Sequence, residues 1–403
     1  MRLDGLLWDV IQKNNFGARI RNARIVGPTQ ASLQNDGNNS DTQLKQESDD
    51  VSAKDQASED GNTSSQQYSP LPPQVILLQL DSGDSLFLML RRNGTRGWEF
   101  VTSRHRVSRA MLMVQPGMHL AVNPSSRYAA VGCSEGVIAI YALNSKEELE
   151  RQHSCGQPLR YIESERHIYF HGVVHKMEFL YPAADDDKHI VLLVLVVWRG
   201  KTRMQLYEWV AGCDLREIRA HSRKGHQLEK SRQMPLLLIP LTIQTTFLLV
   251  YEDSMVMCKD ILQGIPQFID FGESEAATAM HHGSGPPLWT SWARPLRLPY
   301  HTVKQDDIYI VREDGFVKYL ELQIAEDDIR DMNIGILDSN CGTALAYLDY
   351  QPPDADTGDM LVTGGDSCSG GTYVVSYFNP LGIADNFSLT IRTRIFMVLP
   401  FSN

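Results

Sequence analysis

The hydrophobic positions of this 403-residue chain fall into short runs separated by polar or glycine-containing turns. Residues 117–143 show the pattern most completely. Their apolar runs are interrupted at 123–126, where Pro124 fixes φ and the polar neighbours can bond to the backbone, and at a second turn that ends on Gly136. The run after that glycine is β-branched and aromatic, as in a strand. The stretch therefore predicts a meander of antiparallel strands.

The same unit recurs along the chain at steps of roughly 50 to 65 residues, whereas a four-stranded propeller blade needs about 40 to 50. Helical periodicity is weak, and 325–332 is the only brief helical candidate. We therefore predict an all-β fold: a single β-propeller domain over residues 1–403, with about seven blades of four antiparallel strands. The recurring turns lie at 81–84, 199–201, 252–254, 313–315 and 364–366.

The clearest predicted blade covers residues 172–210, with strands over 174–181, 189–198 and 204–210. Its middle run is continuously apolar, which indicates burial on both faces. Further strands are predicted within 74–90, 236–257, 307–322 and 344–378. A partial unit at 6–26 and a C-terminal strand at 391–399 are expected to lie near each other and to complete a seventh blade. Closure of that kind limits exposed sheet edges.

Residues 28–70 differ sharply from the rest, because they are polar and acidic with almost nothing apolar. Such a segment buries too little surface to offset its ordering entropy. We predict a disordered insertion whose flanking strands pair with each other or with neighbouring blades. Within it, eight acids and two lysines at 36–60 contribute −6 of the net charge of −11. The remainder is only mildly acidic, so bulk attraction to nucleic acid is not indicated.

The six cysteines are scattered without metal-like or paired spacing, which favours a reducing compartment. The longest apolar run, 190–198, has nine residues, less than half of the roughly 20 that span a bilayer. We therefore expect no association with a membrane.

Three motifs suggest chemistry, and each has a simpler interpretation. The run GDSCSGG at 365–371 is similar to the nucleophile loop of trypsin-like proteases. Two inserted residues break the required spacing between the serine and the glycines, and no partner histidine has a suitable context. His281 and His282 lack further ligands at metal-site spacing, and 185–187 lacks the glycine and distal glutamate of a calcium loop. A propeller hydrolase, a weaker alternative, would need converging carboxylates or histidines at the axis. We predict no enzyme activity, no catalytic residue, no cofactor and no metal.

Two groups of side chains are candidates for binding. Aromatic residues in or beside expected loops are typical anchors of protein interfaces, and they are Tyr68, Trp98, Trp289, Trp292 and Tyr300. A basic run is the weak candidate for nucleic-acid contact. It contains no aromatic residue on which a base could stack, which favours a solvated loop between strands. The basic run comprises Arg216, Arg219, Arg223, Lys224, Lys230 and Arg232. Binding of a small ligand on a propeller face stays open.

Four runs carry a family resemblance: 4–27, 116–136, 306–322 and 359–375. They resemble the N-terminal propeller region of the methyl-methanesulfonate-sensitivity family. That family belongs with the triple-propeller scaffolds, namely the damaged-DNA-binding subunit, the cleavage-and-polyadenylation A subunit and the splicing factor 3b propeller subunit. The resemblance implies a non-enzymatic nuclear scaffold for other protein subunits, in a cullin-linked ubiquitin ligase that acts in DNA repair and replication stress.

The alternative is a propeller subunit of a splicing or 3′-end cleavage complex that contacts nucleic acid through the 216–232 loop. Proteins of the resembled families also carry two further propellers and a C-terminal helical part, and strands of a first blade precede the region similar to 4–27. The resemblance therefore implies either a fragment or a protein that has lost the parts that contact partners.

Overall fold

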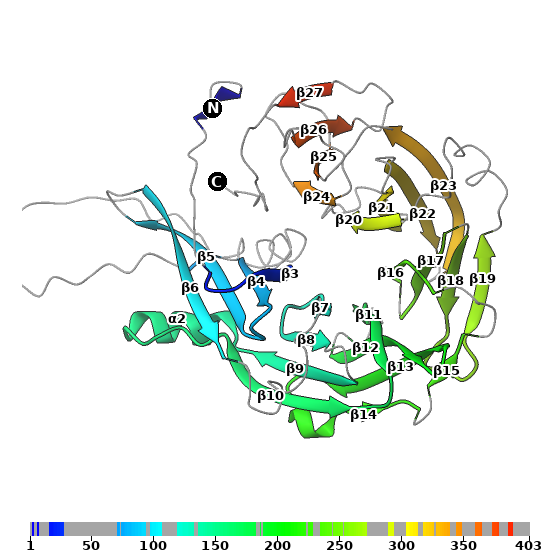
Figure 1. Cartoon of the computed structure of the whole chain (residues 1–403), viewed down its shortest axis with the longest axis horizontal. Helices are drawn as coiled ribbons and strands as arrows, with labels where there is room; N and C mark the ends of the chain where they lie inside the picture. The colour runs from blue at the N-terminus through cyan, green and yellow to red at the C-terminus, as the bar shows by residue number, and fades with distance from the viewer. Residues whose placement is uncertain are drawn as a thin grey trace, which may run out of the picture.

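Strands arranged in chain order round a common centre make up most of the structure (Figure 1). Each sheet is antiparallel, and its strands are hydrogen-bonded in sequence order. This confirms the predicted all-β propeller of four-stranded blades. The computed structural model describes residues 2–3, 6–7, 16–27, 71–72, 74–93, 97–106, 119–132, 136–182, 186, 188–222, 225–228, 234–243, 245–252, 254–271, 289–293, 304–312, 317–325, 328–338, 344–348, 359–364, 373–378 and 386–389.

The first three blades are built as follows. The first contains β3 (Ile20–Val26), β4 (Val75–Leu80), β5 (Ser85–Asn93) and β6 (Gly97–His105). The second contains β7 (His119–Val122), β8 (Tyr128–Gly132), β9 (Val137–Leu143) and β10 (Ile162–Tyr169), with helix α2 (Lys146–Ser154) between its last two strands. The third contains β11 (Val173–Leu180), β12 (His189–Trp198), β13 (Lys201–Val210) and an outer edge made by β14 (Arg219–Ala220) and β15 (His226–Gln227).

The remaining described strands complete three more blades and one short ribbon. The fourth blade contains β16 (Leu237–Pro240), β17 (Phe247–Val250), β18 (Met255–Lys259) and β19 (Gln267–Phe271). The fifth contains β20 (Trp289–Ala293), β21 (Lys304–Arg312), β22 (Val317–Ala325) and β23 (Asp328–Asp338). The sixth contains β24 (Ala344–Leu348), β25 (Asp359–Gly364), β26 (Tyr373–Phe378) and β27 (Asn386–Leu389). A ribbon pairs β1 (Arg2–Leu3) with β2 (Leu6–Leu7).

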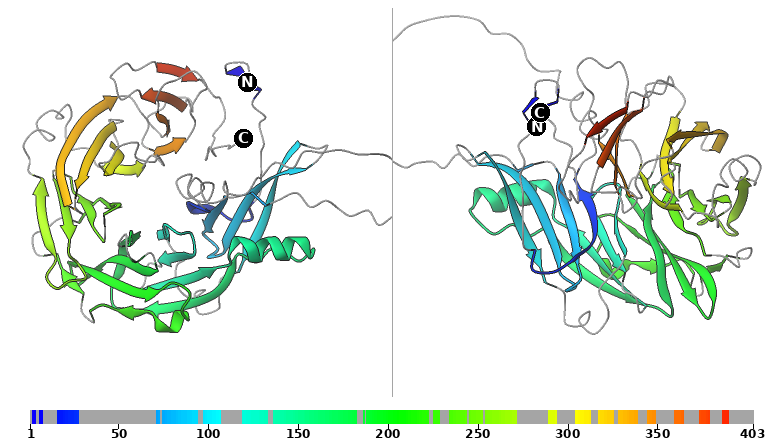
Figure 2. Two further views of the ribbon diagram at one scale, coloured as in Figure 1. Left: turned by 180° about the vertical axis from the view of Figure 1, so that it is seen from behind. Right: turned by 45° about the horizontal axis from the view of Figure 1, so that its top comes forward.

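The first strand of each blade lies nearest the centre, and successive first strands are neighbours. Thus β3 lies beside β7, β7 beside β11, β11 beside β16, β16 beside β20, and β20 beside β24. The β1–β2 ribbon lies on the side of the ring where the sixth and first blades face each other (Figures 1 and 2). The inner strands therefore bring residues from distant parts of the chain to one centre.

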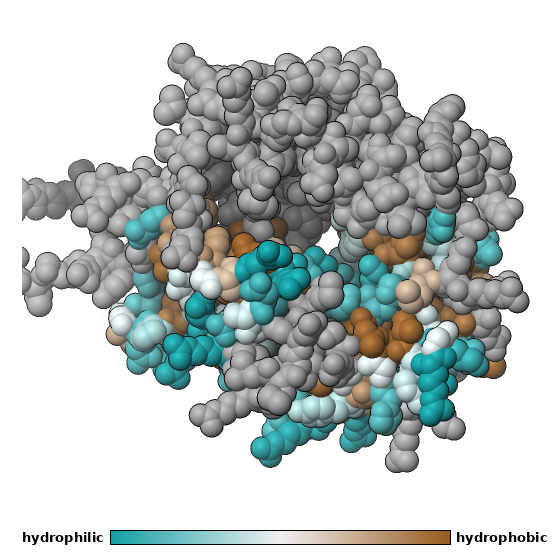
Figure 3. Space-filling view, in the orientation of Figure 1, coloured by the Kyte–Doolittle hydropathy of each residue, from teal (hydrophilic) through white to brown (hydrophobic). Residues whose placement is uncertain are grey.

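The core lies between the blades, as β12 shows best. Its side chains alternate with a period of two, and both sets are buried, as predicted from the continuous apolar run. Leu192 and Val194 pack toward Ile140 of the second blade, whereas Leu193 packs toward Phe247 of the fourth. Complete burial of one such side chain stabilises the fold by roughly 1.5–3 kcal/mol. On the face of the molecule seen in Figure 3, the described apolar residues form several separate patches among hydrophilic ones.

Two turns illustrate why the predicted hairpins form. At 81–84, the Gly83 N–H donates to the Leu80 carbonyl at 3.0 Å, and β4 pairs with β5 across the turn. At 123–126, the Asn123 side chain accepts hydrogen bonds from the N–H groups of Arg127 and Tyr128, both at 2.8 Å. A polar side chain that bonds back to the backbone is the feature that predicted this turn. The strands expected within 74–90, 172–210, 236–257, 307–322 and 344–378 are all confirmed.

The strands that flank residues 28–70 pair with each other, as predicted. Val26, at the end of β3, is the register partner of Val75, at the start of β4. The inserted residues themselves lie outside the described part of the chain, so their predicted disorder stays a prediction.

The prediction that residues 20–26 belong to a partial seventh blade is wrong. β3 is the inner strand of a complete first blade, and β2 pairs only with β1 among the described strands. The reason is packing: Val26 is buried with Leu77 and Phe87, so the apolar side of β3 joins the core of the first blade. The expected C-terminal strand at 391–399 lies outside the described residues.

Helices were also predicted wrongly. The described residues of the candidate at 325–332 are strand: Ala325 ends β22 and is the register partner of Asp328, which begins β23. The described helix, α2, was missed although its start is visible in the sequence. Ser145 and Glu148 stand at capping-box spacing, and the Ser145 hydroxyl accepts the Glu148 N–H at 3.3 Å. No described helix is long and apolar enough to cross a membrane.

Candidate functional site

A groove of about 830 Å³ lies between the second and the third blades. One wall is the end of β10 with the turn that follows it, and it presents Tyr169, Phe170 and His171. The other wall is Trp198 at the end of β12, with Arg203 and other residues of β13 and β14. The groove therefore combines aromatic and arginine side chains from two blades. We call it the aromatic groove.

The turn after β10 is fixed by a glycine of the same blade. The Phe170 N–H donates to the Gly136 carbonyl at 2.9 Å. Gly136, at the end of the predicted turn, has φ +62°, and a Cβ there would lie 2.3 Å from the Phe170 carbonyl oxygen. Glycine is thus required both by the backbone conformation and by the close approach. The turn holds Tyr169, which is 65% exposed, at the edge of the groove.

Trp198 is oriented by three neighbours. The His171 ring stacks against it with 6.3 Å between centroids and 28° between planes. The guanidinium carbons of Arg199 and Arg203 lie 4.4 and 5.0 Å from the indole centroid. Cation–π contacts of this kind contribute about 0.5–2 kcal/mol each, depending on hydration. These three contacts stabilise the observed orientation of the indole.

A short 3-10 helix, η2 (Leu215–Glu217), lies between β13 and β14 of the third blade and contacts β10 of the second. Arg166 of β10 donates to the Leu215 carbonyl and, at 3.3 Å, to the Ile218 carbonyl. The Asp214 carboxylate accepts the Arg216 N–H at 2.8 Å and so caps η2. These bonds fix the outer wall of the groove relative to β10.

Two polar side chains of β13 are engaged within the third blade. Burial raises the pKa of Tyr207 to about 12, so its hydroxyl stays neutral and donates to Gln205 at 3.0 Å. Glu208 of the same strand lies 3.3 Å from both His189 and His221. Among the described residues, no group of three or more His, Cys, Asp or Glu side chains could hold a metal ion.

The structure places only part of the predicted basic run. Arg216 in η2 and Arg219 in β14 are exposed beside the aromatic groove. They belong to the outer edge of the third blade rather than to a free loop, because β14 pairs with β13 through Arg219 and Glu208. The other candidates lie outside the described residues: Arg223, Lys224, Lys230 and Arg232.

The predicted aromatic anchors are not those of the groove. Trp98 lies in β6 and Trp289 in β20, whereas Trp292 packs against the core between the fourth and fifth blades. Tyr68 and Tyr300 lie outside the described residues. Sequence reasoning missed Trp198 because it ends the apolar run of β12. The Arg199-Gly200 turn was the available signal, because it places Trp198 at the end of its strand, where the side chain can line a groove.

The other predicted motifs give limited information. Residues 365–371, His281, His282 and Gly315 lie outside the described part of the chain. Of 185–187, only Asp186 is described; it is exposed, and its carbonyl accepts the His189 N–H at 3.2 Å. That bond belongs to a turn, in agreement with the simpler interpretation.

A comparison with protein families gives one match. The family model described as the RSE1/DDB1/CPSF1 first β-propeller matches residues 2–392. No curated protein matches the chain. The family match spans all six described blades.

Proposed function

Because the chain belongs to the RSE1/DDB1/CPSF1 first β-propeller family, we propose that it is a non-enzymatic scaffold that binds other protein subunits. The aromatic groove is the observation that carries this proposal. Interfaces concentrate their binding free energy in buried Trp, Tyr and Arg residues that fit pockets on the partner. Tyr169, Trp198 and Arg203 provide this composition at one place.

The groove is also preorganised. Ordering a side chain on association costs roughly 0.5–1.5 kcal/mol, and Trp198 is already held by His171, Arg199 and Arg203. The groove side chains therefore lose little conformational entropy when a partner binds. We assign the groove to an extended or loop segment of a protein partner that inserts one large side chain.

The finer proposal is a nuclear adaptor in a cullin-type ubiquitin ligase that acts in DNA repair and replication stress. It is supported by the resemblance of runs such as 116–136 and 359–375 to the methyl-methanesulfonate-sensitivity family. The matched family covers ubiquitin-ligase adaptors and RNA-processing subunits alike, so it supports the scaffold role in both assemblies.

One observation favours the alternative, a propeller subunit of an RNA-processing complex that contacts nucleic acid. Proteins that bind single strands combine a cationic path along the backbone with aromatic platforms for the bases. The basic run lacks aromatics in sequence, yet the fold places Tyr169 and Trp198 in the groove beside which Arg216 and Arg219 are exposed. The same surface thus offers both elements of such a site.

A substitution at Trp198 tests the proposal. We expect Trp198→Ala to abolish recovery of ubiquitin-ligase subunits with the tagged chain, measured by quantitative mass spectrometry of cross-linked complexes. The matched control is Phe268→Ser, which removes an aromatic side chain that is 41% exposed on the outer strand of the fourth blade.

RNA binding separates the two candidates. Titration with a single-stranded RNA at several salt concentrations measures how many phosphate contacts form, because each contact releases counterions. Tight, salt-dependent binding that Arg216→Glu with Arg219→Glu removes, together with unchanged protein partners in Trp198→Ala, would overturn the protein-scaffold assignment of this groove in favour of RNA.

A further inference from the structure

A second concave site lies between the first and the second blades, with a volume of about 650 Å³. One side is the end of β6, from Val101 to Arg106, and the other is the segment from Gln157 to Ile162 that links α2 to β10. We call it the α2 pocket. Its volume falls in the range of about 300–1,000 Å³ that is typical of small-molecule sites.

The lining of the α2 pocket carries charge of one sign. Of the described residues that line it, none is Asp or Glu, and five are basic: Arg104, His105, Arg106, His153 and Arg160. A concave surface lined by one sign of charge concentrates counterions of the other sign. The pocket therefore favours an anion.

Carboxylates near the pocket compensate only part of this charge. The Arg104 Nε lies 3.8 Å from Asp84, and the His105 Nε2 lies 3.0 Å from Glu165. Arg106 and Arg160 are exposed, and neither forms an ion pair with any residue in the described part of the chain. Two guanidinium groups are thus available to a ligand.

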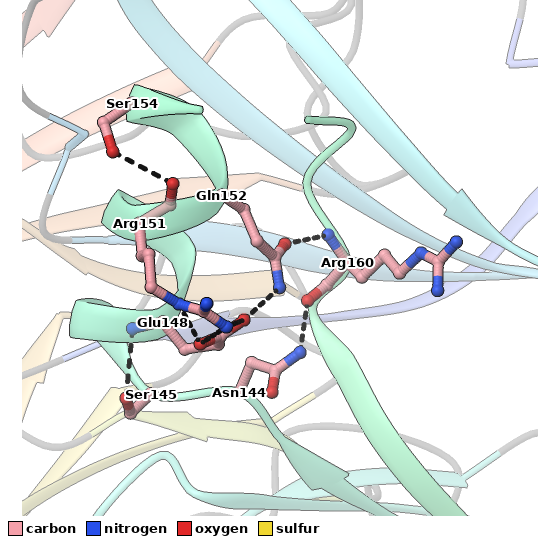
Figure 4. A network of polar contacts seen from close by, with 7 residues as sticks. All are labelled: Asn144, Ser145, Glu148, Arg151, Gln152, Ser154 and Arg160. Atoms are coloured by element: carbon pink, nitrogen blue, oxygen red, sulfur yellow. Dashed lines mark hydrogen bonds and ion pairs between the residues drawn. The ribbon is translucent and has the colours of Figure 1, made fainter. Parts of the chain in front are cut away.

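Helix α2 holds Arg160 in place through its backbone (Figure 4). The Gln152 carbonyl oxygen Oε1 accepts the Arg160 N–H at 2.9 Å, and the Asn144 amide donates to the Arg160 carbonyl at 2.7 Å. Gln152 in turn donates to Glu148 at 3.0 Å, and Glu148 also accepts three bonds from Arg151. With both backbone groups of Arg160 engaged, its side chain extends away from this network (Figure 4).

The base of the pocket is rigid and neutral. The Phe87 and Tyr161 rings stack with 4.5 Å between centroids and 8° between planes. Burial raises the pKa of Tyr161 to about 12, so its phenol carries no charge that would repel an anion. The Ser103 hydroxyl donates to the Leu159 carbonyl at 2.6 Å and joins β6 to the opposite side.

From these observations we propose that the α2 pocket binds a ligand through a phosphoryl group. Guanidinium groups match phosphate oxygens with pairs of parallel hydrogen bonds, and a phosphate monoester carries a charge near −2 that two arginines can balance. Arg106 and Arg160 make these contacts at the rim, and the rest of the ligand lies over the apolar base. The phosphoryl group belongs either to a free polyphosphate or to a phosphorylated side chain of a partner protein.

The test measures binding to the purified chain by calorimetry. Inorganic pyrophosphate represents the free ligand, and a phosphoserine peptide, with its unphosphorylated form, represents the partner. We expect Arg106→Gln with Arg160→Gln to weaken binding at least tenfold. The control, Arg19→Gln with Arg127→Gln, removes two exposed arginines outside the pocket and should bind as the wild type does.

The two probes, pyrophosphate and the phosphoserine peptide, distinguish the two sources of the phosphoryl group. Tighter binding of the phosphopeptide assigns the pocket to a phosphorylated partner, and tighter binding of pyrophosphate assigns it to a free polyphosphate. Equal affinity of the pocket variant and the control overturns the proposal, as does the absence of binding by the wild type to every probe at millimolar concentration. Trp198→Ala should leave phosphate binding unchanged, so this test stands apart from the test of the aromatic groove.

Discussion

The inner and the outer edges of the blades differ in the pairing of their arginine side chains. At the inner edge, the Arg24 Nη2 of β3 lies 3.0 Å from the Glu178 Oε1 of β11, so an ion pair joins the first blade to the third. At the outer edge, Arg106 and Arg160 face the α2 pocket without an ion-pair partner among the described residues. The outer edge also has a contact between blades, from His105 to Glu165, but its two exposed arginines lie outside that contact.

Burial explains the difference. The pKa of His119, on β7, is lowered to about 4, first by burial and then by the charges of Lys176, His175 and Arg24. Burial also lowers the pKa of Lys176, although Glu178 opposes this change. Inner-edge cations are therefore costly to the folded state, whereas the exposed arginines of the outer edge remain hydrated and add little to that cost.

The largest expected effect lies at Gly136, the buried glycine whose carbonyl fixes the turn after β10. Gly136→Val should lower the free energy of unfolding by about 3 kcal/mol or more, because it adds strain at positive φ to a clash with the Phe170 carbonyl. Gly212→Val is the matched control, since Gly212 has φ +87° but nothing within 4 Å of its Cβ position. Denaturant unfolding of both variants measures the difference. Equal losses would contradict the close approach of the two strands.

Next in size is a pH effect at the inner edge. The folded chain holds the pKa of His119 near 4, below the ordinary value of 6.5, so the unfolded chain takes up the proton first. The free energy of unfolding is therefore unaffected by His119 above about pH 6.5. It decreases as the pH falls toward 4, by roughly 3 kcal/mol in all. Unfolding measured from pH 7 to 4 should show this slope. His119→Gln should remove it, and Lys176→Met should reduce it; a slope unchanged in both variants would count against the inner cluster.

A smaller effect is expected at the inner ion pair. Glu178→Gln should cost about 1–2 kcal/mol, because the Arg24 charge is partly exposed and solvent screens part of the loss. On α2, Lys146 and Glu150 lie 3.8 Å apart and are both about half exposed, so Glu150→Gln should cost less than about 0.5 kcal/mol. Thermal or denaturant unfolding compares the two. A larger loss for Glu150→Gln would reverse the proposed contrast between the edges.

The smallest effect is expected for the arginines of the α2 pocket. Arg160→Gln should change the free energy of unfolding by no more than about 0.5 kcal/mol, because the backbone of residue 160, rather than its side chain, carries the bonds to α2. Gln152→Leu provides the contrast, since it removes a buried amide that bonds to that backbone. Equal stability of these two variants in urea would contradict this account of the pocket wall.

Much of the fold was predictable, because local signals and tertiary structure agree. The continuous apolar run of β12 predicted burial on both faces, and Asn123 and Gly83 predicted the turns where they stand. The pairing of β3 with β4 followed from strand-like sequence on both sides of a polar segment. The helix at 146–154 was open to the same reasoning through Ser145 and Glu148. It was missed because Leu149 is its one apolar residue, so its sequence shows no apolar periodicity.

The aromatic groove and the α2 pocket were not predictable, because their walls come from strands of different blades. Arg166 and Ile218 belong to separate blades, and only the fold makes them hydrogen-bonding neighbours. The α2 pocket likewise joins Ser103 to Leu159. The inner cluster depends on a bulge in β11 at His175, which shifts the register with β12 and has no clear sequence signature.

The pairing of Val26 with Val75 has a consequence for how this chain tolerates change in length. The chain leaves the first blade at Gly27 and returns at Leu71, and the two ends are anchored: the Ser126 hydroxyl donates to the Gly27 carbonyl at 2.9 Å, and Leu71 is buried. Closing a loop costs only about 0.6 kcal/mol more for each doubling of its length. We therefore expect the connection between β3 and β4 to tolerate insertions. An affinity tag, a fluorescent domain or a new recognition segment inserted there should leave the register of the first blade unchanged.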